Sequence, residues 1–111
     1  MFETTERKGF CVGFANGWCI SLQWGRGNYG DNYEAEYEAG KAYQSTTAEV
    51  CILTSDSKAG YDAKEKQVCD AYEGIEGWIS PERFAEIVAV VAALPPFDGV
   101  IPKAGEVTDG N

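Results

Sequence analysis

The sequence predicts an α+β fold: an antiparallel β-sheet of three to five strands that starts with a β-hairpin and is covered on one face by a single C-terminal helix. Three observations predict it. Residues 18–24, WCISLQW, alternate between apolar and other side chains with a period of two, which is typical of a half-buried strand. The pair Asn16-Gly17 just before them is a strong hairpin turn signal, because both residue types tolerate a positive φ. Residues 79–96 carry the start and stop signals of one amphipathic helix.

The hairpin is expected over residues 8–24, with its first strand in GFCVGF, residues 9–14. Residues 47–54, TAEVCILT, are a predicted third strand, because Ala48, Val50 and Ile52 would share one face. Residues 67–72 are predicted to form a fourth strand. Residues 75–79 are predicted either to extend this strand or to begin a short new one. The intervening SDSKAGYDAKEK is predicted to be a polar turn.

The helix is the clearest element of the sequence. Ser80 is its expected N-cap and Pro81 its first residue, because proline is tolerated where no backbone donor is needed. Pro95 and Pro96 end it. Its apolar stripe contains Phe84, Ile87, Val88, Val91 and Leu94. We expect this stripe to meet the sheet face that carries Phe10, Val12, Phe14, Trp18, Ile20 and Leu22.

The chain of 111 residues is long enough for one domain. Residues 1–94 are predicted to form this single α+β domain, and residues 95–111 a loosely ordered acidic C-terminal tail. No stretch approaches the roughly 20 apolar residues of a membrane span, and the first ten residues lack a secretory signal pattern. We therefore expect a cytoplasmic protein whose four cysteines are reduced thiols.

Charge narrows the choice of partners. The chain has 9 basic and 18 acidic residues, for a net charge of −9. Direct binding to nucleic acid or to anionic lipid is not expected, because phosphates are bound by clustered Lys and Arg. The acidity instead favours a protein partner with a basic surface, although a small acidic domain can also be merely well solvated.

The residue types argue against catalysis. The sequence has no histidine, which excludes Ser-His-Asp, Cys-His and His-metal chemistry. Its cysteines, Cys11, Cys19, Cys51 and Cys69, fall one to each predicted strand and form no C-x-x-C pair. Four thiols on one sheet face could converge, but half-buried thiols are commoner than a metal site. We predict no enzyme activity, no metal and no cofactor.

The segment 25–45 is expected to be a long surface loop. It opens with GRGNYG, in which Gly25, Gly27 and Gly30 match the Gly-x-Gly-x-x-Gly spacing of dinucleotide-binding folds. That fingerprint needs a parallel strand before it and a helix after it, and neither is predicted here. The glycines are expected to give the chain the backbone freedom that a loop needs after a strand.

Several short motifs resemble those of small uncharacterised proteins encoded by bacteriophages and prophages. The motifs are Asn16-Gly17-Trp18, Ser21, Gln23-Trp24-Gly25 and Gly27-Asn28-Tyr29, followed by TTAEV at 46–50 and GWISPERF at 77–84. The resemblance covers about a third of the chain. It implies a phage origin, a compact α+β domain and a place in the cytoplasm of the bacterial host, and it implies no activity.

The leading functional expectation is a non-catalytic phage protein that inhibits a bacterial defence system, as an anti-CRISPR factor does. Acids spaced along an aromatic loop can take the place of phosphates in a basic protein groove. The candidate partner-binding residues are Trp24, Arg26, Asn28, Tyr29, Asp31, Tyr33, Glu34, Glu36, Tyr37 and Glu38.

Two other functions stay open. The first is a small-ligand or nucleotide sponge, in which a base would stack on Trp24, Tyr29 or Tyr33 and Arg26 would meet a phosphate. The second is a minor virion or assembly protein. A homo-oligomer is compatible with all three functions.

Overall fold

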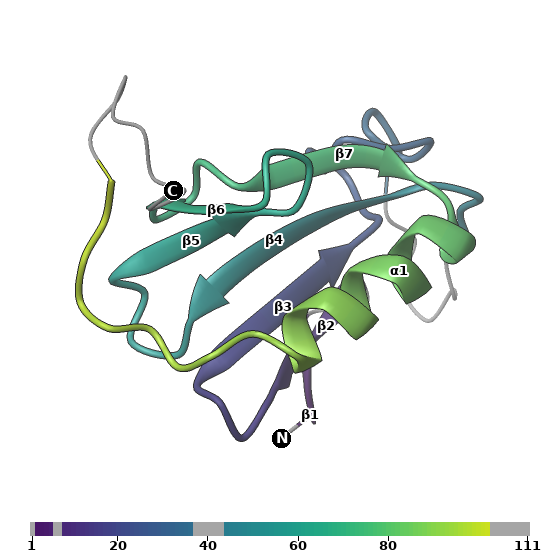
Figure 1. Ribbon diagram of the computed structural model, residues 1–111. Coiled ribbons are helices and arrows are strands. Elements are labelled where there is room, and N and C mark those ends of the chain that lie inside the picture. The colour runs from purple at the N-terminus through teal and green to yellow at the C-terminus, as the bar shows by residue number, and fades with distance from the viewer. Residues whose placement is uncertain (1, 6–7, 37–43, 103–111) are drawn as a thin grey trace.

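The structure is a computed structural model that describes residues 2–5, 8–36 and 44–102. It contains one antiparallel sheet and one helix (Figure 1). The strands are β1 (Phe2–Thr5), β2 (Gly9–Gly13), β3 (Trp18–Gln23), β4 (Ala48–Thr54), β5 (Ala59–Asp62), β6 (Gln67–Asp70) and β7 (Ile75–Ile79), and the helix is α1 (Pro81–Ala92). The predicted fold class, with its opening hairpin and its single C-terminal helix, is confirmed.

The sheet is larger than the predicted three to five strands. Its order is β1-β2-β3-β4-β5-β6, and β7 also pairs with β4. One edge of β4 therefore has two neighbours: Ala48, Val50 and Cys51 pair with β7, and Leu53 pairs with β5. At this branch point residues 75–79 lie beside residues 48–51, and β5 lies farther along the same edge of β4, beside Leu53.

The predicted polar turn after β4 contains strand β5. Ala59, Gly60 and Tyr61 are all buried there. Gly60 lies so close to β6 that an added Cβ would stand 2.8 Å from the carbonyl oxygen of Asp70. A four-residue strand with a glycine in it has too little alternation to be recognised from its pattern.

The hairpin of β2 and β3 forms as predicted. Phe10 is opposite Leu22, and Val12 is opposite Ile20, so these four side chains share one face. The turn includes Gly17, whose φ of +89° is the left-handed conformation that glycine adopts without strain.

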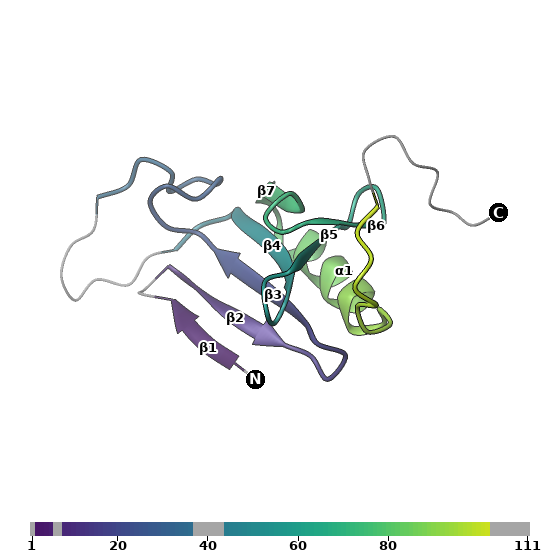
Figure 2. The ribbon, with the colours of Figure 1, turned by 90° about the vertical axis from the view of Figure 1, so that its left-hand side faces the viewer.

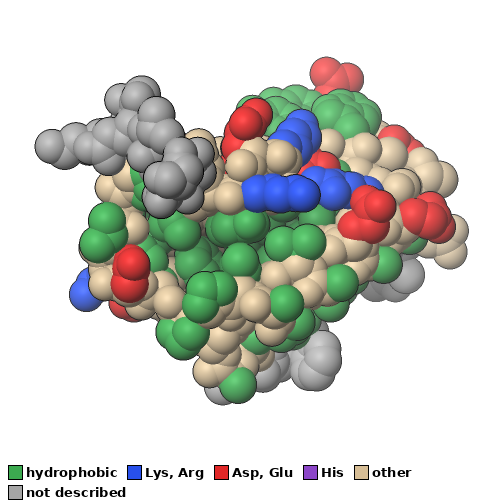
Figure 3. Space-filling model, in the orientation of Figure 1, with side chains coloured by type: hydrophobic (Ala, Val, Ile, Leu, Met, Phe, Trp, Pro, Cys, Tyr) green, Lys and Arg blue, Asp and Glu red, His purple; other side chains and the backbone are tan. Residues whose placement is uncertain are grey.

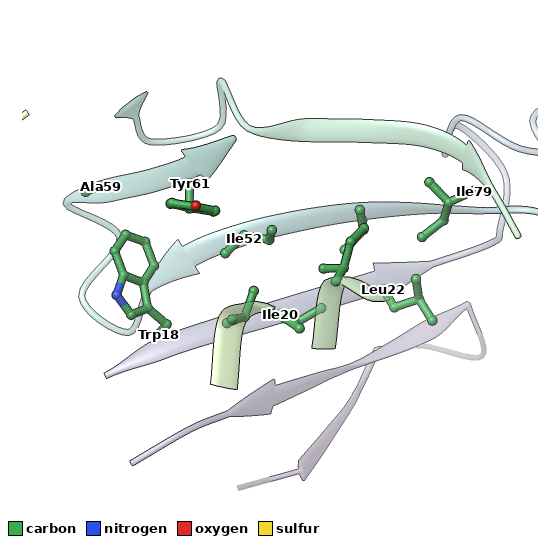
Figure 4. Packing of buried hydrophobic residues seen from close by; sticks show 10 residues of the cluster. Trp18, Ile20, Leu22, Ile52, Ala59, Tyr61 and Ile79 are labelled. Atoms are coloured by element: carbon green, nitrogen blue, oxygen red, sulfur yellow. The ribbon is translucent and has the colours of Figure 1, made fainter. Parts of the chain in front are cut away.

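That face carries the core (Figure 4). Helix α1 packs on it with Ile87 and Val91 fully buried, and the ring of Phe84 meets that of Phe10 edge to face at 6.0 Å. The helix begins as predicted, since the Ser80 hydroxyl accepts a hydrogen bond from the backbone N–H of Arg83. The buried core residues are Trp18, Ile20, Leu22, Val50, Ile52, Ala59, Tyr61, Ile79, Ile87 and Val91.

The segment after the helix packs against the core, which differs from the predicted loose tail beginning at residue 95. The indole N–H of Trp18 donates to the carbonyl oxygen of Pro95 at 3.0 Å. The Phe97 ring packs edge to face on Trp18, and Ile101 also contacts the core. The packed part of the chain thus extends past Leu94, and residues 103–111 lie outside the described residues.

Candidate functional site

The loop that follows β3 is built from successive turns. The backbone N–H of Gly27 donates to the Tyr33 carbonyl, and that of Tyr33 donates to the Gly30 carbonyl. Gly27 has a φ of +80°, which favours glycine. No helix follows Gly30 in residues 31–36, and β3 is antiparallel to both of its neighbours, so this segment lacks the setting of a dinucleotide site.

Asn28 anchors the loop to the sheet. Its side chain is buried at 8% exposure, and its Oδ1 accepts from the backbone N–H of Gly25. Its Nδ2 donates to Gln23 at 3.3 Å and to Glu49 at 3.4 Å. The other oxygen of Glu49 accepts the backbone N–H of Tyr29 at 2.9 Å. Asn28, a predicted partner-binding residue, therefore lies inside the loop, and Glu49 is a second anchor that the sequence did not single out.

Asp31 ties the loop to the start of β4. Its carboxylate accepts hydrogen bonds from the hydroxyls of Thr46 and Thr47, and its backbone N–H donates to the Thr47 hydroxyl at 2.9 Å. These hydroxyl donors, Thr46 foremost, hold the pKa of Asp31 below its usual value. The Asp31 carboxylate therefore already has hydrogen-bond partners within the protein.

Two tyrosines of the loop form an exposed stack. The rings of Tyr29 and Tyr33 are parallel within 1°, with centroids 5.8 Å apart, and the two residues are 50% and 45% exposed. Strand β7 holds Tyr29 through one backbone hydrogen bond, because the Tyr29 carbonyl accepts the backbone N–H of Trp78 at 2.8 Å. An added Cβ at Gly77 would stand 2.4 Å from the Cβ of Tyr29, so only glycine fits there.

Strand β7 adds more exposed apolar surface beside this stack. Between Glu76 and Ile79 it has one residue more than β4 opposite it, so it contains a β-bulge. At the bulge Trp78 has a φ of +57°, a conformation that is strained for an aromatic residue, and it is 59% exposed. Ile75 and Tyr72 are also exposed.

The exposed large apolar side chains of the described residues are concentrated here. Five of the six lie on the loop or along β7 and the turn before it, and the sixth is Val100. Figure 3 shows hydrophobic side chains gathered at the upper edge of the molecule, over β7. We call this surface the aromatic edge; it consists of Tyr29, Tyr33, Tyr72, Ile75 and Trp78.

Trp78 is the main residue of this surface that sequence reasoning missed, although the sequence contains a signal for it. Trp78 and Ile79 are adjacent apolar residues in a strand, and a regular strand places adjacent side chains on opposite faces. Ile79 is buried, so Trp78 must point elsewhere.

The other predicted site residues are divided between the surface and the interior. Arg26, Glu34 and Glu36 are exposed on the loop. Trp24 is half-buried and packs edge to face on Phe10, so it belongs to the core side of the sheet. Tyr37 and Glu38 lie outside the described residues.

A cavity of about 470 Å³ lies between the end of β3 and the start of α1. Its lining residues are Leu22, Trp24, Gln44, Ser45, Thr46, Thr47, Ala48, Ile79, Ser80, Pro81 and Phe84. None of these described residues is Lys or Arg, so the lining offers no cation for a phosphate.

The four cysteines all lie on strands, and their thiols share the sheet face opposite the helix. Burial and, after it, the negative charge of Glu49 raise the pKa of Cys51 to about 11. Burial and the charges of Asp62, Glu73 and Asp70 raise the pKa of Cys69 to about 11. At neutral pH these thiols stay protonated, which is unfavourable for nucleophilic attack and for metal binding. Within the described residues no group of three or more His, Cys, Asp and Glu side chains could hold a metal ion.

No family model, no curated protein and no solved structure matches this chain. Among the described residues no helix has the length and apolar character needed to cross a membrane.

Proposed function

We propose that this chain is a non-catalytic binding protein that docks on a basic protein surface through the aromatic edge and the acids of loop 25–36. The observation that carries this proposal is the exposed Tyr29–Tyr33 stack, fixed in place beside Trp78. Exposed aromatic side chains give a large contact area at small conformational cost, and they are the residues that most often dominate interface energies.

Hydrogen bonds within the chain hold residues 25–36 of the loop against the sheet and the start of β4. Asn28 and Glu49 fix one side of it, and Asp31 fixes the other through two threonines. Ordering a loop on binding costs free energy, so a loop that is already ordered binds more tightly for the same contacts. This preorganisation supports a docking role for a segment rich in glycine and polar residues.

Charge supports a basic partner. Glu34 and Glu36 are exposed on the same loop, and the whole chain has a net charge of −9. Complementary charge steers encounter and raises the association rate, most strongly at low ionic strength. A basic groove that normally holds nucleic acid fits this surface.

The finer proposal is that the partner is a component of a bacterial defence system and that the chain inhibits it. The phage-like motifs support this biological setting, and an acidic surface that competes with nucleic acid gives the inhibition its physical basis. In bacteria that carry a nucleic-acid-guided defence, expression of the protein should restore plaque formation by a targeted phage.

Affinity capture from such cells tests the proposal. One identified protein should be retained by the parent and lost with Trp78→Ser and with the double variant Glu34→Lys/Glu36→Lys. The control is a double reversal at two exposed acids away from the loop and from the aromatic edge, Glu65→Lys/Glu86→Lys, which should still retain it. Equal capture by all variants would show that the aromatic edge is not the docking surface.

The cavity of about 470 Å³ keeps a small-ligand function as the alternative, because Trp24 and Phe84 line it and could hold an apolar group. Native mass spectrometry of the purified protein separates the two functions. A co-purified small molecule that is lost with Trp24→Ala, in the cavity lining, would replace the docking proposal with the small-ligand function.

A further inference from the structure

The turn between β2 and β3 carries the adjacent pair Asn16-Gly17. Asparagine is a thermally labile residue, because the backbone nitrogen of the following residue can attack its side-chain amide. Glycine in the following position favours this attack, since it has no Cβ to crowd the nitrogen. The other asparagines of the described residues, Asn28 and Asn32, are each followed by a tyrosine. The sequence therefore makes Asn16 the most reactive of the three.

The folded chain holds the attacking nitrogen in a hydrogen bond. The backbone N–H of Gly17 donates to the Phe14 carbonyl at 3.0 Å, and the Gly17 carbonyl accepts the N–H of Ser55 at 2.9 Å. Attack requires the Gly17 nitrogen to lose its proton, and a hydrogen-bonded amide of a folded protein exchanges its proton when its segment opens. The Gly17 nitrogen is therefore unreactive while the hairpin turn is closed.

The end of helix α1 holds the Asn16 side chain at the same time. Figure 2 shows the turn beside this end of the helix and the start of the segment that follows it. Nδ2 of Asn16 donates to the Val91 carbonyl at 2.9 Å and to the Leu94 carbonyl at 2.8 Å. Its Oδ1 accepts the backbone N–H of Trp18 at 3.0 Å. The attack makes Cγ tetrahedral and expels Nδ2, so these three hydrogen bonds have to break first.

We propose that Asn16 deamidates only when the turn separates from the end of α1, so that the modification accumulates with the time that the chain spends open there. Hydroxide removes the Gly17 amide proton, and the nitrogen bonds to Cγ of Asn16. Nδ2 then takes a proton from water and leaves as ammonia. Water opens the resulting cyclic imide at either carbonyl, which gives aspartate or isoaspartate, the latter with the backbone running through Cγ. No atom is oxidised or reduced, and water supplies the new oxygen.

The modified turn cannot rebuild the same contact. An aspartate carboxylate accepts hydrogen bonds but donates none, and it would face the carbonyl oxygens of Val91 and Leu94, which are acceptors as well. Isoaspartate also lengthens the backbone between Phe14 and Trp18, which a hydrogen bond of 2.9 Å joins across the turn. A chain that has reacted therefore opens more readily than before. This inference is independent of the proposed function, because the aromatic edge lies on the loop and along β7.

Peptide mass analysis of the full chain, incubated at mildly alkaline pH, tests the proposal, because deamidation adds about 1 Da. In urea Asn16 should convert at least about tenfold faster than Asn28 and Asn32, and without urea its conversion should be at least about tenfold slower than in urea. Ile87→Ala, which loosens the packing of α1, should raise the rate without urea severalfold. Ala89→Ser, on the exposed side of the helix, should leave it unchanged. Equal rates for the parent with and without urea, or no response to Ile87→Ala, would overturn the proposal.

Two further measurements do not depend on how well Ile87→Ala folds. Conversion of Asn16 in the parent should speed up with urea added below the unfolding transition, because urea favours the open turn. A constant rate over that range would mean that the closed turn reacts. Asn16→Asp reproduces one of the two products, and at neutral pH it should unfold at a lower urea concentration than the parent. An Asn16→Asp chain as stable as the parent would overturn the claim that the modified turn opens more readily.

Discussion

At the scale of single residues, Asn16 illustrates how one side chain can join two parts of a fold. It lies in the hairpin turn between β2 and β3, and its Oδ1 accepts the backbone N–H of Trp18 at 3.0 Å. Its Nδ2 donates to the carbonyls of Val91 at 2.9 Å and Leu94 at 2.8 Å. Val91 lies in the final turn of helix α1, which lacks a basic residue there, and Leu94 follows the C-cap residue Ala93. The side chain of this hairpin-turn residue therefore also holds the C-terminal end of the helix.

Replacing Asn16 with alanine should lower the free energy of unfolding by about 1–3 kcal/mol, because it removes the amide that donates to the Val91 and Leu94 carbonyls. Urea unfolding followed by tryptophan fluorescence measures the change. Ser55→Ala, an exposed change near the same turn, should stay within about 0.5 kcal/mol of the parent. Equal stabilities for the two variants would mean that water replaces the Asn16 amide without cost.

Asp31 gives a prediction for acid pH. Its pKa in the folded protein is lowered by the Thr46 and Thr47 hydroxyls, so its contribution to stability is present above its unfolded pKa. That contribution is lost as the pH falls through the lower folded value. The amide NMR signals of Thr46 and Thr47 should therefore shift with a midpoint below 3.8. In Asp31→Asn this titration should be absent, and a midpoint at or above 3.8 in the parent would contradict the hydrogen-bonded carboxylate.

At the scale of elements, the sequence predicts what is decided locally and misses what is decided by neighbouring strands. Helix α1 begins at Ser80-Pro81, where capping and proline chemistry act within one turn. Strand β5 depends on the close approach of β6 to Gly60, and the bulge at Trp78 depends on β4, so neither is visible in a local pattern. The candidate site likewise has residues that composition predicts and residues whose positions depend on tertiary contacts. Tyr29 and Tyr33 were predicted from composition, whereas the inward positions of Asn28 and Trp24 follow from tertiary contacts.

The packing of α1 on the sheet can be tested at Ile87, which is fully buried. Ile87→Ala should destabilise the protein by roughly 2–5 kcal/mol, because it removes buried surface and leaves a cavity. Ala89→Ser, on the exposed side of the same helix, should change stability by less than about 0.7 kcal/mol. Chemical denaturation measures both, and a loss of under 1 kcal/mol at Ile87 would mean that the site collapses onto its neighbours.

The bulge in β7 predicts an uncommon order of stabilities. Trp78 has a positive φ, which glycine adopts freely and other residues adopt at a cost of about 1 kcal/mol. Trp78→Gly should therefore be more stable than Trp78→Ala by about that amount, the reverse of the usual preference in strands. Thermal unfolding of the two variants measures the difference. Both should lose partner binding, since both lack the exposed indole.

At the scale of the whole molecule, the sheet separates two environments. One face is closed by α1 and the segment that follows it, and the other carries the half-buried cysteines. The chain is acidic overall, yet none of the described residues that line a hollow of about 790 Å³ on that second face is charged. The net charge could be read from the sequence, whereas its distribution between faces needed the strand registers.

Thiol chemistry reports on this separation. Burial raises the pKa of Cys51 and Cys69 from 9.0 to about 11, so the thiolate fraction near pH 8 should be roughly a hundredfold smaller than in the unfolded chain. Alkylation at low micromolar protein should be slow in buffer, rise about tenfold with each pH unit up to about 11, and become fast in urea. Equal rates with and without urea would show that both thiols are open to solvent and unperturbed.

The branch point at β4 has a consequence for synthesis on the ribosome. Strands β1 to β4 are consecutive and can pair as soon as they leave the exit tunnel, but the outer edge of Ala48–Cys51 has to wait for residues 75–79. Until then it is an unpaired strand edge next to the apolar core positions Val50 and Ile52. A nascent chain in which residues 48–54 have left the tunnel while residues 75–79 are still inside it therefore exposes a template for pairing with its neighbours on the same polysome. Rapid translation through this interval, or a chaperone bound over it, would protect the protein from aggregating before it is complete.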